Sequence, residues 1–250
     1  PRRGRVGLLT GCAQKVLNPA INEATIRLLT RMGIEVVITP GQGCCGALTH
    51  HMGQHDPAMA AARANIAAWA SEIAGEGLDA IVVNASGCGT TIKDYGFMFR
   101  EEPEAEAAAQ VSALAMDITE VLEKFAYAPT REKPGLTVAY HSACSLQHGQ
   151  KITALPKALL TRAGFTVKEP AESHICCGSA GTYNILQPAI AGQLGSATLV
   201  AAAAGVSPIT VSRALRGERA VAPELVERVQ AAAAKLGYVP DPAARALATP

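Results

Sequence analysis

The sequence predicts an α/β protein: two duplicated cysteine-rich α/β units, the second of them truncated, followed by a small all-α helix-turn-helix segment. Three observations support this fold class. Strand-like apolar runs alternate with helical stretches, which is typical of a largely parallel sheet. One cysteine pattern occurs twice with the same spacing. Beyond residue 195 the chain contains no cysteine and becomes rich in alanine.

The elements of the first copy follow in a regular order. Residues 6–9 form a short buried strand that leads to Cys12. Residues 19–31 carry apolar residues at helical spacing, with Asn18 as the expected cap and Pro19 in the first turn. A strand over 34–38 leads into the glycine-rich loop of Cys44 and Cys45. A long helix is then expected from about 57 to 74. A strand over 80–84 follows and leads to Cys88. The cysteines are therefore expected on loops at strand ends, where open α/β sheets bind ligands.

The second copy repeats the first and then stops. Cys12, Cys44, Cys45 and Gly46 recur as Cys144, Cys176, Cys177 and Gly178, each displaced by 132 positions, as in 144 − 12. The equivalent of Cys88 would be Ala220, and no cysteine lies near it. The likeness ends near residue 194, so a boundary is expected at 194–198. The expected domains are 1–128, 129–194 and 195–250.

Composition and charge exclude some classes of protein. The 250 residues include 22 Lys and Arg against 21 Asp and Glu, a formal net charge of +1. That balance excludes a strongly basic nucleic-acid binder as a global description, although a local basic surface stays open. No apolar run is long enough to span a bilayer, and no secretory signal is visible. Seven cysteines without such a signal favour reduced thiols in the cytoplasm. A chain that starts with Pro1 is expected to be part of a longer protein.

Four thiolates of the first copy, Cys12, Cys44, Cys45 and Cys88, must converge from several loops if they share a ligand. Soft thiolates suit an iron–sulfur cluster or zinc. Zinc more often uses two Cys-x2-Cys knuckles, which this chain lacks. The alternative is that the cysteines are buried as small apolar residues. His141 lies three residues before Cys144, and a supporting or solvated role is favoured over metal ligation.

These motifs resemble a known family. The Gly-Cys-Cys-Gly around Cys44, Ser86-Gly87-Cys88-Gly89, the stretch 141–145 and the stretch 175–183 are similar to the paired cysteine-rich (CCG) domains of glycolate oxidase iron–sulfur subunits, over about residues 4–194. The resemblance implies an electron-transfer subunit that passes electrons from a flavin-containing subunit, which oxidises glycolate, towards quinone. It implies a 4Fe–4S cluster, with zinc as the alternative cofactor and flavin only in the partner. Membrane association, at the inner face, would come only through the complex.

The resemblance also implies the ligands, which are Cys12, Cys44, Cys45, Cys88, Cys144, Cys176 and Cys177. Two departures from the family pattern affect this expectation. The chain has no ferredoxin-like domain with Cys-x2-Cys-x2-Cys-x3-Cys-Pro runs. The second copy lacks its last cysteine, so a cluster there would need an outside ligand. Electron transfer by this chain alone is therefore not expected.

The C-terminal segment has the layout of a helix-turn-helix. A helix is expected over 198–204, Gly205 makes the turn, Ser207 caps the second helix, and Pro208 is its first residue. Val211 and Leu215 face inward, and a third helix follows from about 222 to 236.

This segment resembles the DNA-binding headpiece of the lac repressor family over about 197–249. That resemblance implies contacts of Ser207, Thr210 and Ser212 with phosphates, of Pro208, Ile209 and Arg213 with base edges, and of Leu247 with the minor groove. The departures are a shortened first helix and the absence of an effector-binding domain after Pro250.

Several interpretations therefore stay open. The redox subunit is favoured by its larger extent, and a lac repressor family regulator fragment is the alternative. Both pieces are incomplete where they meet, which favours a junction of two gene fragments. A redox-sensing repressor, a zinc-stabilised scaffold and a helical tail with no DNA role are the remaining hypotheses.

Overall fold

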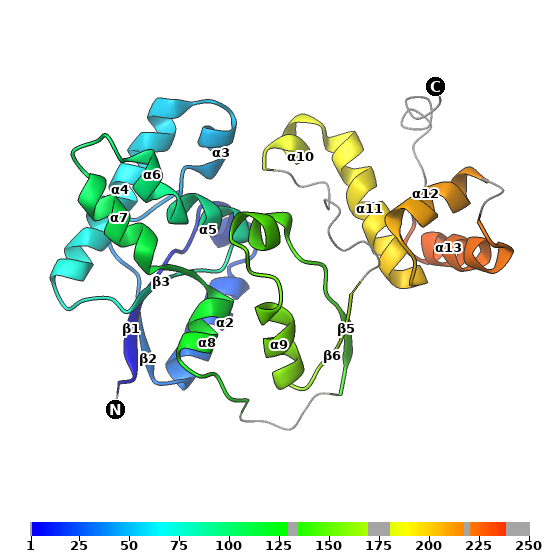
Figure 1. The fold of residues 1–250 in the computed structure, drawn as a ribbon, viewed down its shortest axis with the longest axis horizontal. Coiled ribbons are helices and arrows are strands. Elements are labelled where there is room, and N and C mark those ends of the chain that lie inside the picture. Colours follow the sequence, from blue (N-terminus) through cyan, green and yellow to red (C-terminus); the bar gives the residue numbers. More distant parts are fainter. Residues whose placement is uncertain (1, 130–134, 170–180, 218–220, 239–250) are drawn as a thin grey trace. The chain divides into compact units, whose positions relative to one another are not determined.

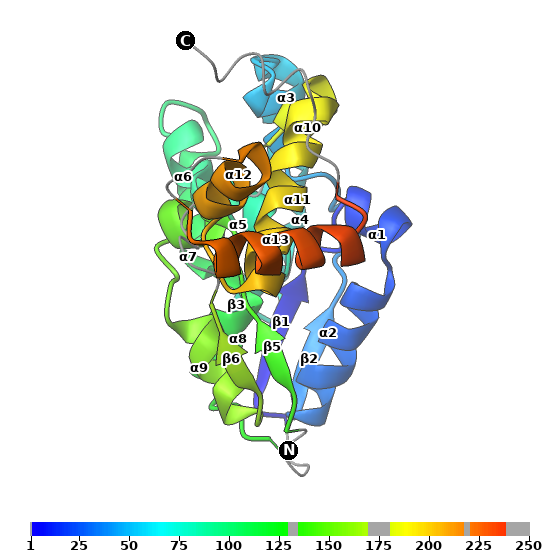
Figure 2. The same ribbon diagram turned by 90° about the vertical axis from the view of Figure 1, so that its right-hand side faces the viewer.

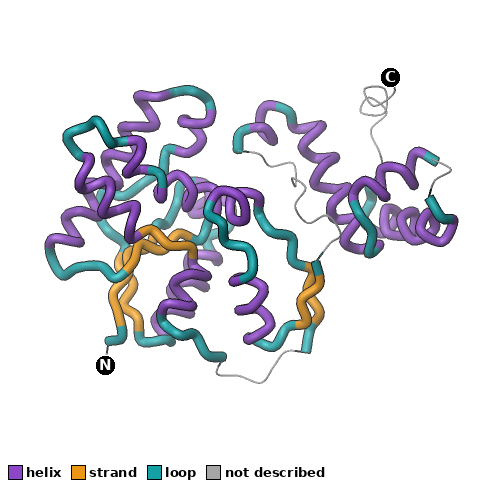
Figure 3. The backbone as a smooth tube through the Cα atoms, viewed as in Figure 1, coloured by secondary structure: helices purple, strands orange, loops and turns teal. Residues whose placement is uncertain are grey.

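The computed structural model describes residues 2–129, 135–169, 181–217 and 221–238. The chain forms two compact units, the first of Pro1–Arg131 with Ser145–Leu159 and the second of Glu132–Cys144 with Leu160–Pro250. Figure 1 colours them along the sequence, and Figure 3 separates helices from strands. The segment Ser145–Leu159 belongs to the second cysteine copy, yet it packs in the first unit. The expected boundaries at 128 and 194 stay predictions.

The first unit is built on a parallel sheet of strand order β2-β1-β3-β4. Its strands are β1 (Gly4–Leu8), β2 (Ile34–Val37), β3 (Ala80–Val83) and β4 (Ala115–Asp117). Val6 of β1 pairs with Val36 on one side and Ala80 on the other. All residues of β1 and β3 are buried. Central parallel strands are covered on both faces, which explains the unbroken apolar sequence of β3. The predicted α/β class is thus confirmed.

One face of the sheet packs against the long helix and the segments that follow β3. The helices are α3 (Ala47–His51), α4 (His55–Ala74), α5 (Ser86–Lys93), α6 (Tyr95–Met98) and α7 (Ala105–Leu114). Trp69, Tyr95 and Phe99 are fully buried in this core with Ile81 of β3. Figure 1 shows α4 and α7 on this side. Cys45 belongs to the same core and Cys88 packs against it, so two candidate ligands sit at its edge.

The opposite face is covered by α2 (Ala20–Arg31), α8 (Ile118–Lys124) and the start of α9 (Leu155–Arg162). Leu29, Val121 and Leu159 meet Val6 and Val82 in this core. Leu159 comes from the second copy, so that copy helps to close the first unit. A short π-helical turn, η1 (Ser145–Gly149), precedes α9.

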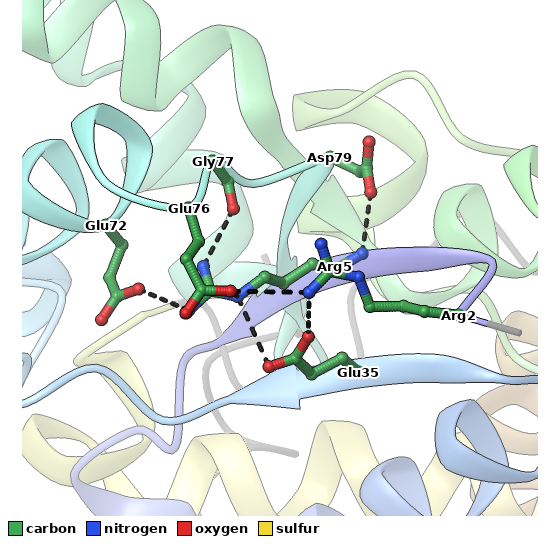
Figure 4. A network of polar contacts seen from close by, with 7 residues as sticks. All are labelled: Arg2, Arg5, Glu35, Glu72, Glu76, Gly77 and Asp79. Carbon is green, nitrogen blue, oxygen red and sulfur yellow. Dashed lines mark hydrogen bonds and ion pairs between the residues drawn. The ribbon is translucent and has the colours of Figure 1, made fainter.

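A charged network lies at the start of β1, beside the residues that precede β3 (Figure 4). Arg5 of β1 is 7% exposed, and its Nη2 lies 2.8 Å from the Glu72 Oε2. Its guanidinium also donates to the Gly77 carbonyl at 2.9 Å, and its backbone N–H donates to Asp79 at 2.7 Å. These bonds attach the end of α4 to β1, which fixes the helix against the sheet.

The start of α2 differs from the expectation. A short helix, α1 (Ala13–Leu17), comes before it, and the Asn18 N–H bonds to the Gln14 carbonyl at 3.0 Å. Asn18 therefore closes α1 and does not cap α2, whose N-cap is Pro19 without a side-chain bond. The predicted Asn18 cap is wrong because Asn18 is the residue that ends α1. The long helix likewise begins at His55, two residues before the expected position.

The second unit contains β5 (Thr137–Ala139) and β6 (Thr166–Lys168), which pair in parallel, as Figure 2 also shows. Its helices are α10 (Tyr183–Leu186), α11 (Pro188–Ala204), α12 (Pro208–Arg216) and α13 (Pro223–Lys235). The last three share a core that contains Val200, Val211 and Val229. No further strand occurs among the residues described for this unit. In the part of the chain that the structure covers, no helix is long and apolar enough to cross a membrane.

The helix-turn-helix has the expected turn and a longer first helix. Gly205 adopts a left-handed φ of 65°, and the Ser207 Oγ accepts the Thr210 backbone N–H at 3.0 Å. The first helix was expected over 198–204, but it is the end of the seventeen-residue α11. The expected start was wrong because the alanine-rich stretch before residue 198 continues the same helix. The expected boundary at 194–198 therefore falls inside α11.

Candidate functional site

Four cysteines gather at one edge of the parallel sheet. Cys12 follows β1, Cys44 and Cys45 follow β2, and Cys88 lies in the first turn of α5 after β3. These strands are neighbours in the order β2-β1-β3. Because parallel strands end at the same edge, the three loops meet there. The structure thus brings together the four cysteines that the sequence analysis expected to converge.

The four thiols interact with one another. Cys12 is hydrogen-bonded to Cys44, and Cys45 is hydrogen-bonded to Cys88. Negative charge on Cys45 also raises the pKa of Cys12, and negative charge on Cys12 or Cys44 raises the pKa of Cys88. The two pairs are therefore close enough to interact electrostatically. The arrangement is one thiol cluster contributed by three loops.

The surroundings favour different proton states along this cluster. The hydrogen bond to Cys88 and then burial raise the pKa of Cys45 far above its ordinary value. The same hydrogen bond, donated by Cys45, lowers the pKa of Cys88. Partial removal from water and then the bond with Cys44 raise the pKa of Cys12. Within this pair Cys45 keeps its proton, and its bond favours the thiolate form of Cys88.

Asn65 of α4 holds the Gly-Cys-Cys-Gly loop. Its side chain is fully buried and bonds the loop twice: Oδ1 accepts the Gly43 N–H at 2.7 Å and Nδ2 donates to the Cys44 carbonyl at 2.8 Å. The Tyr95 hydroxyl donates to the Cys45 carbonyl at 2.8 Å. Buried backbone groups need such partners, and these bonds fix the loop that carries two thiols.

A second set of amides ties the Cys12 loop to the end of β3. The Gln14 Nε2 donates to the Asn84 Oδ1 at 2.8 Å, and the Asn22 Nδ2 donates to the Thr10 carbonyl at 2.8 Å. The Asn84 Nδ2 donates to the Asn22 Oδ1 at 3.0 Å and to the Thr25 Oγ1 at 3.0 Å. This network links the segments on either side of Cys12 to the strand that precedes Cys88.

The sequence analysis did not single out Asn65 or Tyr95. A signal was present, because Asn65 lies among apolar residues on the buried face of α4, next to Ile66 and one turn from Ala62 and Trp69. A polar residue on such a face must find a partner inside the protein. Tyr95 carried no comparable signal, since a buried tyrosine is common in a core.

The donor set fits an iron–sulfur cluster better than a single metal ion. Thiolates are the ligands that these clusters take from proteins. Among the residues that the structure describes, no group of three or more His, Cys, Asp or Glu side chains is arranged to hold one metal ion. Zinc needs sulfurs at about 2.3 Å around one point.

Three further cysteines are predicted ligands. Cys144 is half-buried and precedes η1 in the chain, and it falls in the second unit. His141 is also half-buried. Cys176 and Cys177 lie outside the described residues.

The predicted DNA-contacting residues lie on and beside α12. Ile209 is 44% exposed, and Ser212 and Arg213 are exposed as well. Ser207 and Thr210 are half-buried and bonded to each other in the cap. Pro208 is the first residue of α12, and Leu247 lies outside the described residues. The exposed face of α12 thus presents three of the seven predicted residues.

Comparisons with known proteins agree with both parts of the sequence. Residues 199–241 match the profile of bacterial regulatory proteins of the lacI family. The glycolate oxidase iron–sulfur subunit of Escherichia coli K12 is 42% identical over 191 residues, which is 76% of this chain and 47% of that protein. The probable glycolate oxidase iron–sulfur subunit of Bacillus subtilis is 33% identical over 192 residues, 75% of this chain and 42% of that protein.

A smaller relative is covered more fully. Lactate utilization protein A of an Exiguobacterium species is 28% identical over 198 residues, 76% of this chain and 77% of that protein. This chain spans less than half the length of the two glycolate oxidase subunits. The cysteine-rich domain (CCG) profile matches residues 6–93 and 138–214, so residues 199–214 match both profiles. The two CCG matches cover more than half of the chain and confirm the duplication, so this protein belongs to the cysteine-rich CCG domain family.

Proposed function

We propose that this protein is an iron–sulfur electron-transfer subunit, with Cys12, Cys44, Cys45 and Cys88 as the cluster ligands. The observation that carries the proposal is the interaction of four thiols, in two bonded pairs, from three adjacent strand ends. The names of the relatives, which are iron–sulfur subunits of an oxidoreductase, support it. We propose a 4Fe–4S cluster, which would supply reversible uptake and release of an electron.

The chain's own residues have distinct tasks in this proposal. The cysteines supply thiolate ligands, and Asn65 and Tyr95 hold the loop of Cys44 and Cys45 in place. The apolar core around Cys45 keeps water away from that side of the site. Exclusion of water and hydrogen bonds near sulfur set the reduction potential of such centres. The Gly46 N–H, 3.4 Å from the Cys44 Sγ, is one such bond.

The proposed reaction partner is a flavin-containing subunit that oxidises a 2-hydroxy acid such as glycolate. Electrons would pass from that subunit through this chain towards quinone, at the inner face of the cytoplasmic membrane. The names of the glycolate oxidase and lactate utilization relatives support a 2-hydroxy acid as the substrate. Cys144, Cys176 and Cys177 are proposed as ligands of a second site that needs a further ligand from outside.

The first experiment measures iron, zinc and acid-labile sulfide per chain on anaerobically purified protein, together with its visible spectrum. We expect about four iron and four sulfide, with absorbance near 400 nm that bleaches on reduction. Cys44→Ser and Cys45→Ser should abolish this iron, whereas Cys144→Ser should leave it in place. Zinc alone, or iron that persists in Cys45→Ser, would overturn the assignment.

A second candidate function is DNA binding through α12. The observations that favour it are the lacI-family match and the exposed Ile209, Ser212 and Arg213 on a helix capped by Ser207. We propose phosphate contacts for Ser207, Thr210 and Ser212 and base contacts for Pro208, Ile209 and Arg213. Leu247 would enter the minor groove.

A titration with double-stranded DNA tests this candidate. Arg213→Ala should weaken binding by about tenfold, since a base contact contributes roughly 1–3 kcal/mol. Lys235→Ala, which removes the same charge from the end of α13, is the matched control and should have the smaller effect. Equal binding by the two variants, or none by the unmodified protein, would show that the segment has no DNA role.

A further inference from the structure

The turn from Ser145 to Gln150 packs on the helix that carries Cys88. The Ser145 Oγ donates to the Ser86 Oγ at 2.7 Å, and the Gln150 Nε2 donates to the Ser86 carbonyl at 2.9 Å. In return, the Thr90 Oγ1 donates to the Ser145 carbonyl at 3.2 Å. Three bonds therefore surround the first turn of α5, and Cys88 lies between the bonded residues Ser86 and Thr90.

Two glycines allow this close approach. A Cβ atom added to Gly89 would stand 2.6 Å from the Gln150 Nε2, and one added to Gly149 would stand 3.0 Å from the Thr90 Oγ1. Real Cβ atoms essentially never come as close as the first distance. Gly89 follows Cys88 directly, so the glycine of this motif is explained by the contact with Gln150.

The turn itself is held firmly. It is a π-helical turn, closed by the Gln150 N–H bonding to the Ser145 carbonyl at 3.0 Å. Leu146 and Ile152 are each 7% exposed, and the Ile152 N–H bonds to the Leu146 carbonyl at 3.0 Å. Single π-helical turns are rare and recur at functional sites. A rigid turn can fix the residues that it touches.

We propose that the turn Ser145–Gln150, which belongs to the second cysteine copy, is a positioning element of the first copy's cysteine site. It holds the first turn of α5 and thereby sets the place and exposure of the Cys88 thiol. The inference rests on the proposed function for the role of Cys88 as a ligand. The geometric part, that Gln150 covers and orients this turn, stands on the contacts alone.

The test measures the alkylation rate of each cysteine by iodoacetamide in metal-free protein, followed by mass spectrometry. Gln150→Ala removes one bond and the cover over Gly89. Cys88 should then react about fivefold faster, the change expected from one lost hydrogen bond, while exposed Cys12 keeps its rate. His148→Ala, an exposed residue of the same turn, is the control and should change neither rate.

A double variant separates positioning from simple loss of stability. Gly89→Ala should disturb Cys88 through its clash with Gln150, and Gly89→Ala combined with Gln150→Ala should be no worse than Gln150→Ala alone, because the clashing atoms are gone. The fluorescence of Trp69, which is the only tryptophan and is fully buried, reports whether each variant folds.

Cluster content provides a second readout. In anaerobic protein, Gln150→Ala should retain less iron and sulfide after exposure to a chelator than His148→Ala does. An unchanged Cys88 alkylation rate in a folded Gln150→Ala variant would overturn the inference. Absence of iron from the unmodified protein would instead overturn the proposed function, and the alkylation rates would still decide the positioning role.

Discussion

At the scale of single residues, the cysteine site depends on a buried amide. Asn65 supplies both a donor and an acceptor to the loop of Cys44, from a side chain that is fully buried. We predict that Asn65→Ala lowers the free energy of unfolding by about 2–4 kcal/mol, because two backbone groups of the loop lose their partners. Urea unfolding of metal-free protein, followed by Trp69 fluorescence, measures this change.

The matched control is Asn18→Ala, which removes an exposed amide at the end of α1. Its expected effect is within about 0.5 kcal/mol, as for surface substitutions in general. If the two variants unfold alike, Asn65 does not hold the loop. Asn65→Ala should also lose iron, since its loop carries two of the proposed ligands.

A second residue-scale prediction concerns Asp117, which is 5% exposed and begins α8. Burial raises the pKa of its carboxyl, and the charge of Glu120 raises it further, while the bonds from Thr119 and the charge of Lys93 lower it. Because the pKa of Asp117 is higher in the folded state than in the unfolded chain, its protonated form favours folding. The contribution of Asp117 to stability is therefore complete below about pH 4 and is lost as the pH rises through the folded-state pKa.

We therefore predict that Asp117→Asn gains stability relative to the unmodified protein as the pH rises from 3 to 7. Asparagine keeps the capping oxygen and carries no charge to bury. Unfolding free energies measured across this range give the difference directly. Asp94→Asn, which makes the same substitution at an exposed carboxyl, is the control. A constant difference for Asp117→Asn would contradict the prediction.

At the scale of elements, the loop between β2 and α3 depends on one glycine. Gly46 has a left-handed φ of 81°, and an added Cβ would stand 2.9 Å from the Ala58 carbonyl oxygen. We predict that Gly46→Ala costs about 2–4 kcal/mol, since backbone strain and a clash with backbone atoms add. Thermal unfolding and iron content measure the effect.

The same loop offers a control. A Cβ added to Gly43 meets nothing within 4 Å, and the N–H that bonds to Asn65 is kept in Gly43→Ala. Gly43→Ala should therefore fold and bind iron like the unmodified protein. Equal losses in both variants would mean that general flexibility, and not the geometry at Gly46, is what the loop requires.

Helix α11 shows how the two parts of the sequence meet. It runs without a break from Pro188 to Ala204, through the region where a boundary was expected. Residues 199–214, at its end and in α12, match both family profiles. The structure therefore joins the two resemblances by a continuous helix, and the shared core of α11, α12 and α13 forms its end.

At the scale of the whole molecule, the two cysteine copies do not correspond to the two compact units. Leu159, from the second copy, is 5% exposed in the core of the first unit. We predict that Leu159→Ala destabilises the first unit by about 2–4 kcal/mol, the usual cost of a cavity left by leucine. Urea unfolding followed by Trp69 measures this unit specifically, since Trp69 lies in its core.

Leu136→Ala is the control for that experiment. It makes the same chemical deletion at a side chain that is 60% exposed, so its expected effect is within about 0.5 kcal/mol. A small effect of Leu159→Ala would show that the second copy does not complete the first unit.

The sequence was sufficient for features that depend on local pattern. The strands predicted over 6–9 and 80–84 correspond to β1 (Gly4–Leu8) and β3 (Ala80–Val83), and Ser207 before Pro208 defines a helix start. The convergence of Cys12, Cys44, Cys45 and Cys88 followed because parallel strands end at one edge. The Asn18 cap was wrong because α1, only five residues long, was too short to be recognised by periodicity.

The sequence by itself determined the duplication, the α/β class, the cysteine loops and the helix-turn-helix. Each of these features can be recognised from the types and spacing of residues along the chain. Only the tertiary structure decided which thiols pair, that Asn65 and Tyr95 hold the Cys44 loop, and that Gln150 lies on Gly89. The physical reason is that these contacts join residues that are 21 to 64 positions apart in the sequence. Their partners are selected by the packing of whole helices on the sheet, and local sequence does not encode that packing.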